Sequence, residues 1–137
     1  MSERQVCAMG CDPYWLRAVE DSAAGYAVAP VACPGNLIDC LKLLPKAAPG
    51  DLLLVDATGQ SDIAGVVSRL WEAGWLHVVV VAADPSYKEA RDVLGKTRAQ
   101  DYWQKTYETK AIRASILGFW GEMTASATMP RDEEARG

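Results

Sequence analysis

The sequence lacks the features that would direct it to nucleic acid or a membrane. It contains no run of Lys and Arg, and its 14 basic residues are outnumbered by 18 acidic ones. No apolar run approaches the roughly 18 residues that a membrane-spanning helix needs. Residues 1–6 are polar and lack the basic stretch and apolar core of a secretory signal. We therefore expect a cytoplasmic protein whose partners are proteins or small molecules, not nucleic acid or a membrane.

Cysteine and histidine do not form a recognisable metal or disulfide framework. The four cysteines, Cys7, Cys11, Cys33 and Cys40, fit no zinc-binding spacing, and a domain of this length needs no disulfide. We expect four free thiols, with Cys7 and Cys33 behaving as small apolar side chains beside buried strands. The single histidine, His77, opens a predicted strand at the end away from the expected site, so we assign it no catalytic role.

What the sequence does contain is enough apolar residues for one core. Half of the 137 residues are hydrophobic, which suits one domain of ordinary size. Near the C-terminus the helical pattern gives way to Ser, Thr, Pro and charged residues. We therefore expect one domain over residues 1–123 and a loosely ordered tail over residues 124–137.

Five short apolar runs alternate with helical patterns along the chain. The runs cover residues 5–9, 27–32, 52–55, 77–82 and 102–103. Residues 52–55 and 78–81 are continuously apolar, which is typical of parallel strands covered by helices on both faces. Apolar residues at helical spacing lie between and after the runs, near residues 16–23, 37–44, 63–71, 90–94 and 112–120. The pattern predicts an α/β fold, a doubly wound (βα)5 parallel sheet whose functional crevice lies at the carboxyl ends of the strands.

Turn and capping residues agree with this alternation. Asp12 precedes Pro13, which places a capping carboxylate and a helix-starting proline together. Gly25 and Gly74 are expected to end helices. We expect Asp12 to act mainly as the N-cap of the first helix.

Three segments bring polar residues to the expected strand ends. Asp56 follows the run at residues 52–55, and residues 99–105 read Ala-x-Asp-Tyr-x-x-Lys. Residues 6–13 form the third segment, a strand followed by a turn that contains Asp12. In this order the segments resemble the receiver domains of bacterial response regulators, over about residues 5–121.

The resemblance implies a flavodoxin-like receiver fold with strand order 2-1-3-4-5 and a role for each of these positions. Asp56 lies at the phosphoacceptor position, Lys105 and Ala82 at the phosphate-contact positions, and Tyr102 at the switch aromatic. Asp12 is the remaining acid of a metal site that would hold Mg²⁺ in the family. From the strand-end geometry we expect Lys105 to pair with Asp56 across the crevice.

Several positions depart from the family pattern. Gly10 and Cys11 replace the acidic pair that would bind magnesium, a hard ion that prefers oxygen ligands. Ala82 replaces a threonine or serine, and Thr106 replaces the proline that usually follows the lysine. The resemblance therefore implies an incomplete phosphorylation site.

From this we expect an atypical receiver that takes part in two-component-type signalling through protein contacts, with no enzymatic activity and no cofactor unless magnesium still binds. The family pattern points to the face of the fourth and fifth helices as the contact surface. Its partner would be a histidine kinase, a downstream effector or a second copy of the chain. Two alternatives stay open, a functional phosphoacceptor phosphorylated on Asp56 and a small-ligand carrier of the flavodoxin-like or cobalamin-binding kind. The first loop has neither the Asp-x-His motif of cobalamin binders nor the phosphate loop of flavin binders.

Overall fold

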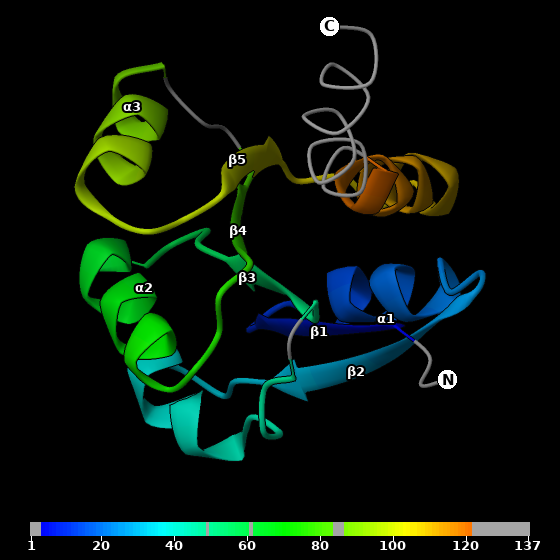
Figure 1. Cartoon of the computed structure of the whole chain (residues 1–137), viewed down its shortest axis with the longest axis horizontal. Helices are drawn as coiled ribbons and strands as arrows, with labels where there is room; N and C mark the ends of the chain where they lie inside the picture. The colour runs from blue at the N-terminus through cyan, green and yellow to red at the C-terminus, as the bar shows by residue number, and fades with distance from the viewer. Residues whose placement is uncertain (1–3, 49, 61, 84–86, 122–137) are drawn as a thin grey trace, which may run out of the picture.

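A computed structural model describes residues 4–48, 50–60, 62–83 and 87–121 as a five-stranded parallel sheet covered by helices on both faces (Figure 1). The elements in chain order are β1 (Arg4–Gly10), α1 (Pro13–Asp21), β2 (Tyr26–Ala32), the 3₁₀ helix η1 (Leu37–Leu43), β3 (Leu52–Asp56), α2 (Ile63–Glu72), β4 (Val78–Ala82), α3 (Tyr87–Lys96) and β5 (Asp101–Gln104). A further helix covers residues 109–121. The strand order is β2-β1-β3-β4-β5, and all neighbours pair in parallel. The predicted fold and strand order are confirmed.

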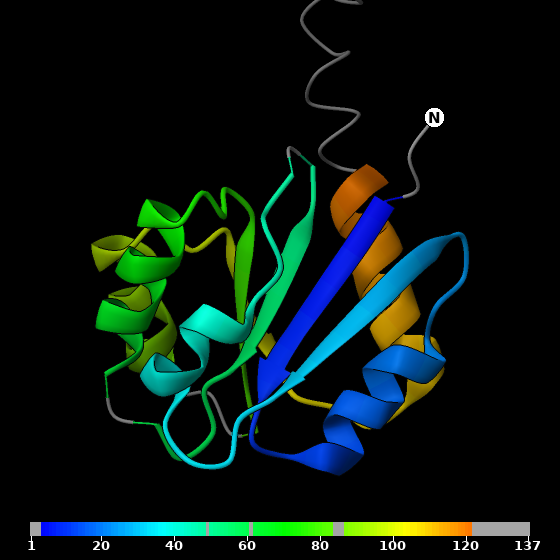
Figure 2. The same cartoon turned by 90° about the horizontal axis from the view of Figure 1, so that it is seen from below.

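Successive residues of the central strands face opposite sides of the sheet and build two cores. Figures 1 and 2 show α1 and the helix of residues 109–121 on one face, with η1, α2 and α3 on the other. The first face buries Val6, Ala8, Trp15, Leu16, Val19, Leu52, Leu54, Val79, Val81, Ile112, Ile116 and Trp120. The second buries Cys7, Met9, Cys33, Leu37, Cys40, Leu53, Val55, Val66, Val67, Leu70, Trp75, Val78 and Val80. Burial on both faces explains why the strands are continuously apolar.

The connection between β2 and β3 differs from the sequence-based prediction. An amphipathic α-helix was expected near residues 37–44, but the segment forms the 3₁₀ helix η1 and Leu44 is already extended, with ψ of 144°. Asn36 begins the turn by accepting a hydrogen bond from the amide of Ile38. Pro45 follows, and proline disfavours the helical conformation of the residue before it. The helix therefore ends before Leu44, two residues before Lys46.

Local signals place the first helix and the turns as predicted. The Asp12 carboxylate accepts hydrogen bonds from the amides of Tyr14 and Trp15, at 3.0 and 3.3 Å, and so caps α1. Gly25 and Gly74 have positive φ, 79° and 101°, which favours glycine where the chain turns back toward a strand. These turns keep all five strands parallel and bring their carboxyl ends to one edge of the sheet.

The register aligns the strand ends at that edge. Met9 on β1 lies beside Val55 on β3, and Asp56 at the end of β3 lies beside Val81 on β4. Residues 122–137, which include the expected domain boundary and tail, lie outside the described residues. Within the described part of the chain, no helix is both long and apolar enough to cross a membrane.

Candidate functional site

Lys105 lies between two carboxylates at the carboxyl edge of the sheet. Its Nζ atom is 2.9 Å from Oδ2 of Asp56 and 2.9 Å from Oδ2 of Asp12. Its side chain is 6% exposed, and that of Asp56 is 4% exposed. The backbone amide of Lys105 donates to the carbonyl of Ala82 at 2.7 Å. This bond continues the pairing of β5 with β4 and fixes the position of the Lys105 backbone. The predicted pairing of Lys105 with Asp56 is confirmed.

Asp56 uses both carboxylate oxygens. One oxygen accepts the ammonium of Lys105, and the other accepts a hydrogen bond from the amide of Thr58 at 3.0 Å. The carboxylate therefore holds the loop after β3 and also balances the lysine. Such a buried charge is tolerated because it is paired and hydrogen-bonded.

Asp12 joins the cluster from the first loop while it caps α1. The Tyr107 hydroxyl donates a short hydrogen bond to the Asp12 carboxylate, and Lys105 Nζ lies 5.5 Å from the centroid of the Tyr107 ring. Burial would raise the pKa of Asp12, but the hydrogen bonds from Tyr107 and Lys105 outweigh it and lower that pKa to about 2. Burial would lower the pKa of Lys105, but its hydrogen bonds to Asp12 and Asp56 raise it above its ordinary value. At neutral pH the cluster therefore holds one cation between two anions.

The end of β1 approaches Asp56 too closely for a side chain. A Cβ atom added to Gly10 would lie 2.9 Å from Cβ of Asp56 and 3.4 Å from the ring of Trp15. Cys11 is exposed, and its Sγ atom is 3.1 Å from the carbonyl oxygen of Gly35. Burial, followed by the nearby Cys40 and Asp56, raises the pKa of the Cys11 thiol, so the thiol stays protonated at neutral pH. These two positions, where the family resemblance places an acidic pair, present no carboxylate to Asp56.

This set of residues does not fit a magnesium ion. Magnesium requires close to octahedral oxygen coordination, whereas the carboxylates of Asp12 and Asp56 are both engaged by the ammonium of Lys105. Over residues 4–48, 50–60, 62–83 and 87–121, no three His, Cys, Asp or Glu side chains are grouped so as to hold a metal. We therefore derive no chemical step through a metal here.

The remaining predicted site residues lie along β4 and β5. Ala82 is buried at the end of β4 and offers a methyl group where a receiver would offer a hydroxyl. Tyr102 is half-buried and packs against the core on the α2 side of the sheet. Its proposed role as a switch aromatic remains a prediction.

Two residues of this region were not singled out as site residues from the sequence. The hydroxyl of Thr58 accepts a hydrogen bond from the amide of Ala83 at 3.2 Å, so a hydroxyl from the loop after β3 reaches the end of β4. Tyr107 reaches Asp12 from the connection that follows Lys105. No local sequence pattern indicates these contacts, because 95 residues separate Tyr107 from Asp12 and 25 separate Ala83 from Thr58.

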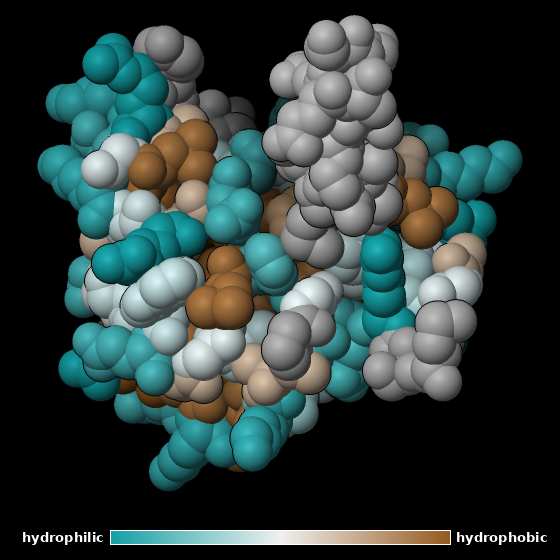
Figure 3. All heavy atoms as spheres, in the orientation of Figure 1, coloured by the Kyte–Doolittle hydropathy of each residue, from teal (hydrophilic) through white to brown (hydrophobic). Residues whose placement is uncertain are grey.

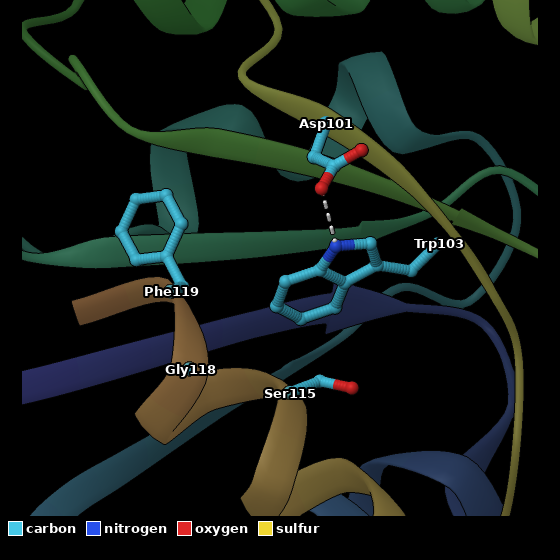
Figure 4. Close-up of a pocket in the computed structure, with 5 residues that line it drawn as sticks. All are labelled: Asp101, Trp103, Ser115, Gly118 and Phe119. Atoms are coloured by element: carbon cyan, nitrogen blue, oxygen red, sulfur yellow. Dashed lines mark hydrogen bonds between the residues drawn. The ribbon is translucent and has the colours of Figure 1, made fainter. Parts of the chain in front are cut away.

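A shallow groove lies between β5 and the helix of residues 109–121. Its volume is about 210 Å³. Figure 4 shows the residues that line it, Asp101, Trp103, Ser115, Gly118 and Phe119. The indole Nε1 of Trp103 donates to Asp101 at 2.9 Å, which fixes the ring along one wall. Trp103 and Ser115 also line an adjoining hollow of about 600 Å³ that reaches Lys105. The groove therefore leads from the charged cluster onto the outer edge of the sheet.

Comparisons with known proteins identify the fold. The sequence matches no protein-family model and no curated protein. Among solved structures, the signal receiver domain of an HD domain-containing protein from Pseudomonas fluorescens Pf-5 has a TM-score of 0.68 at 13% identity, with 93% of each chain covered. The chain has the receiver-domain fold, which is the CheY-like, flavodoxin-like arrangement.

Two further structures are similar. A CheY-like response regulator from Mesorhizobium loti has a TM-score of 0.58 at 22% identity, covering 85% of this chain and 98% of that one. An atypical orphan response regulator, described as having a phosphorylation-independent regulatory mechanism, has a TM-score of 0.56 at 20% identity, covering 80% and 89%. At these identities the likeness establishes the fold.

Proposed function

We propose that this chain is an atypical receiver domain in two-component-type signalling, and that it acts through protein contacts without forming an aspartyl phosphate. It carries no enzymatic activity of its own in this proposal. Its partner is a protein, either a histidine kinase, a downstream effector or a second copy of the chain. The fold supports the signalling class, and the strand-end cluster supports the absence of phosphorylation.

The observation that carries the proposal is the composition of the cluster around Asp56. Phosphoryl transfer to a carboxylate depends on positioning and on neutralising the charge of the phosphoryl oxygens. Here the acids that would hold a divalent ion are replaced by Gly10 and Cys11, and Gly10 leaves no room for a larger side chain. The ammonium of Lys105 is shared between the carboxylates of Asp12 and Asp56, so one positive charge faces two negative ones. A phosphoryl group on Asp56 would therefore meet Lys105 without the metal ion that would neutralise its other oxygens.

The end of β4 supports the same conclusion. Ala82 cannot donate the hydrogen bond that would report the phosphoryl group to the rest of the domain. The hydroxyl of Thr58 is positioned from the loop after β3, where it accepts a hydrogen bond from the amide of Ala83, so it does not stand in the Ala82 position at the end of β4. Likeness to an orphan regulator with a phosphorylation-independent mechanism adds a precedent within this fold.

We place the partner contact on the surface formed by α3, β5 and the helix of residues 109–121. The groove of Figure 4 lies on this surface, and Trp103 forms one of its walls. Tryptophan is enriched at protein interfaces because it offers a large rigid area and a polar N–H. The surface adjoins Lys105 through the second hollow, so it could sense changes in the charged cluster.

The proposal is tested by magnesium titration and by association measurements. Tryptophan fluorescence follows the titration, because Trp103 lies two residues from Lys105. We expect no saturable quenching at millimolar magnesium. In sedimentation velocity, Asp56→Asn should self-associate as the wild type does, whereas Ser115→Arg, which fills the groove, should weaken any association. Ser68→Arg on exposed α2 is the matched control, and magnesium-dependent association would contradict the proposal.

A further inference from the structure

A second pocket lies at the opposite end of the sheet, between the end of η1 and the end of α2. Its volume is about 230 Å³, and it is lined by Leu41, Lys42, Leu44, Pro45, Lys46, Arg69, Leu70, Ala73 and Trp75. In Figures 1 and 2, η1 and α2 lie side by side on the face away from α1. The chain enters β3 after the first of these helices and β4 after the second. The pocket therefore lies at the amino ends of the strands, away from Asp56.

Three cations line this pocket. Lys42 lies in the last turn of η1, Arg69 lies in the last turn of α2, and Lys46 follows Pro45. All three are exposed, and no Asp or Glu is among the residues that line the pocket. Within the described residues, none of the three forms an ion pair with a carboxylate. The residues that line the pocket thus carry three positive charges and no negative one, in a chain whose formal net charge is −4.

The floor of the pocket is apolar. Leu70 and Trp75 are 0% and 2% exposed and belong to the core on this side of the sheet. Leu41 and Leu44 are half-buried and pack on the same core, while Leu43 is 57% exposed. On the molecular face of Figure 3, hydrophobic residues reach the surface in patches bordered by hydrophilic ones. The pocket has this composition, with an apolar base and a charged rim.

We infer that this pocket binds a short acidic segment of a protein partner, with one aliphatic side chain of the segment on the apolar floor and its carboxylates on Lys42, Lys46 and Arg69. Electrostatic complementarity of this kind sets partner choice and the rate of encounter. The volume suits a single side chain, since sites that enclose a whole small-molecule ligand usually measure about 300–1,000 Å³.

The number of cations at the pocket and the net charge of the chain argue against anionic lipid and nucleic acid as ligands. Recognition of anionic lipid usually involves about 4–8 clustered Lys and Arg residues, and this pocket has three. Nucleic acid carries one phosphate charge every few ångströms, so it would meet the repulsion of an acidic protein beyond the pocket. A peptide segment can place a few carboxylates on the rim and end there.

Binding at this pocket is independent of the state of Asp56. The inference goes beyond the proposed function, since a chain that is phosphorylated on Asp56 would still carry the pocket. Conversely, if the peptide does not bind, the proposal that Asp56 is not phosphorylated is unaffected. The two proposals therefore fail in separate experiments.

The test uses fluorescence anisotropy with a labelled peptide that has two central leucines flanked by Asp and Glu. We expect saturable binding that weakens as ionic strength rises. The triple variant Lys42→Gln, Lys46→Gln and Arg69→Gln should lose roughly ten-fold in affinity, since three exposed charge pairs each contribute a fraction of that factor. In ¹H–¹⁵N spectra, the peptide should shift the amides of residues 41–44, 46 and 69–75 and the indole N–H of Trp75.

A second triple variant gives the matched control, because it removes the same net charge from exposed positions elsewhere. Arg4→Gln, Arg17→Gln and Arg98→Gln should change the affinity by less than about two-fold if the pocket is the binding site. Equal losses in the two triple variants would overturn the inference. So would equally tight binding of a peptide with glycines in place of the leucines, or binding to vesicles of phosphatidylserine and phosphatidylcholine that is stronger than binding to the peptide.

Discussion

The ammonium of Lys105 lies 2.9 Å from a carboxylate oxygen of Asp56, and less than a tenth of either side chain is exposed to solvent. At this separation in a poorly hydrated site, each charge compensates the burial of the other. Removing either partner would leave an uncompensated buried charge. Asp12 adds a second carboxylate on the solvent side of the lysine, with 21% of its side chain exposed. The cluster thus links the loop after β1, the end of β3 and the segment after β5 through one cation shared by two carboxylates.

Removing the lysine should destabilise the domain strongly. Lys105→Met leaves Asp56 buried without its cation, and breaking a buried pair in this way typically costs about 3–5 kcal/mol. Urea denaturation followed by tryptophan fluorescence measures the loss. The double variant Lys105→Met, Asp56→Asn should recover a large part of it, because the unpaired charge is gone. The control Arg17→Met breaks an exposed pair with Asp21 and should cost less than about 1 kcal/mol. A similar cost for Lys105→Met would contradict the expectation that Asp56 needs a buried cation.

The Asp12 pairing predicts a specific dependence of stability on pH. Its pKa of about 2 lies below the ordinary 3.8, so the carboxylate stabilises the folded state above the ordinary value and loses this effect as pH falls toward 2. Asp12→Asn keeps a side chain that can cap α1 but removes the charge. We expect it to lower the unfolding free energy by roughly 1 kcal/mol at neutral pH, a value reduced by partial solvation. The difference from wild type should shrink between about pH 5 and pH 2, and a constant difference would contradict the assignment.

The two missing acids should behave differently when they are restored. Gly10→Asp forces a Cβ atom to within 2.9 Å of Cβ of Asp56, and overpacking of this kind typically costs about 1–3 kcal/mol. Cys11→Asp changes an exposed side chain and should alter stability by less than about 1 kcal/mol. Because it adds a carboxylate near Asp56, Cys11→Asp should bind magnesium more tightly than the wild type in a fluorescence titration. Cys11→Asn is the control, and equal magnesium binding by both variants would contradict the metal argument.

The strand assignments are tested by placing a charge in the centre of the sheet. Leu54 is 1% exposed, so Leu54→Asp buries an unpaired carboxylate between two helix layers, at a cost of several kcal/mol. We expect it to be insoluble or to show no cooperative unfolding by circular dichroism. Leu43 is 57% exposed, and Leu43→Asp should unfold as the wild type does. If the two variants unfold alike, β3 is wrongly placed.

The sequence was sufficient to predict the sheet because burial on both faces leaves a direct record in it. Continuous apolar runs such as residues 78–81 indicate strands covered by helices, and Asp12, Gly25 and Gly74 mark where the chain turns. The position of Asp56 beside Lys105 followed from the rule that parallel strands end at one edge. These features depend on local pattern and on topology, and both can be inferred from a single chain.

Other features depend on contacts that no local pattern records. The segment at residues 37–44 has helical spacing, but it forms the 3₁₀ helix η1, whose Leu37 and Cys40 are buried in the core on the α2 side of the sheet. The bond between Tyr107 and Asp12 joins residues 95 positions apart. The lack of room at Gly10 arises from Asp56 across the strand pair. Each requires the positions of two separate elements to be known together.

The central claim is that Asp56 does not serve as a phosphoacceptor. The most direct measurement is intact-mass spectrometry of the wild type and of Asp56→Asn after incubation with magnesium and acetyl phosphate. We expect neither protein to gain a phosphoryl group, because Gly10 and Cys11 supply no acids to hold the metal and Ala82 has no hydroxyl to donate to the phosphoryl group. Stoichiometric addition of one phosphoryl group to the wild type, abolished in Asp56→Asn, would contradict it.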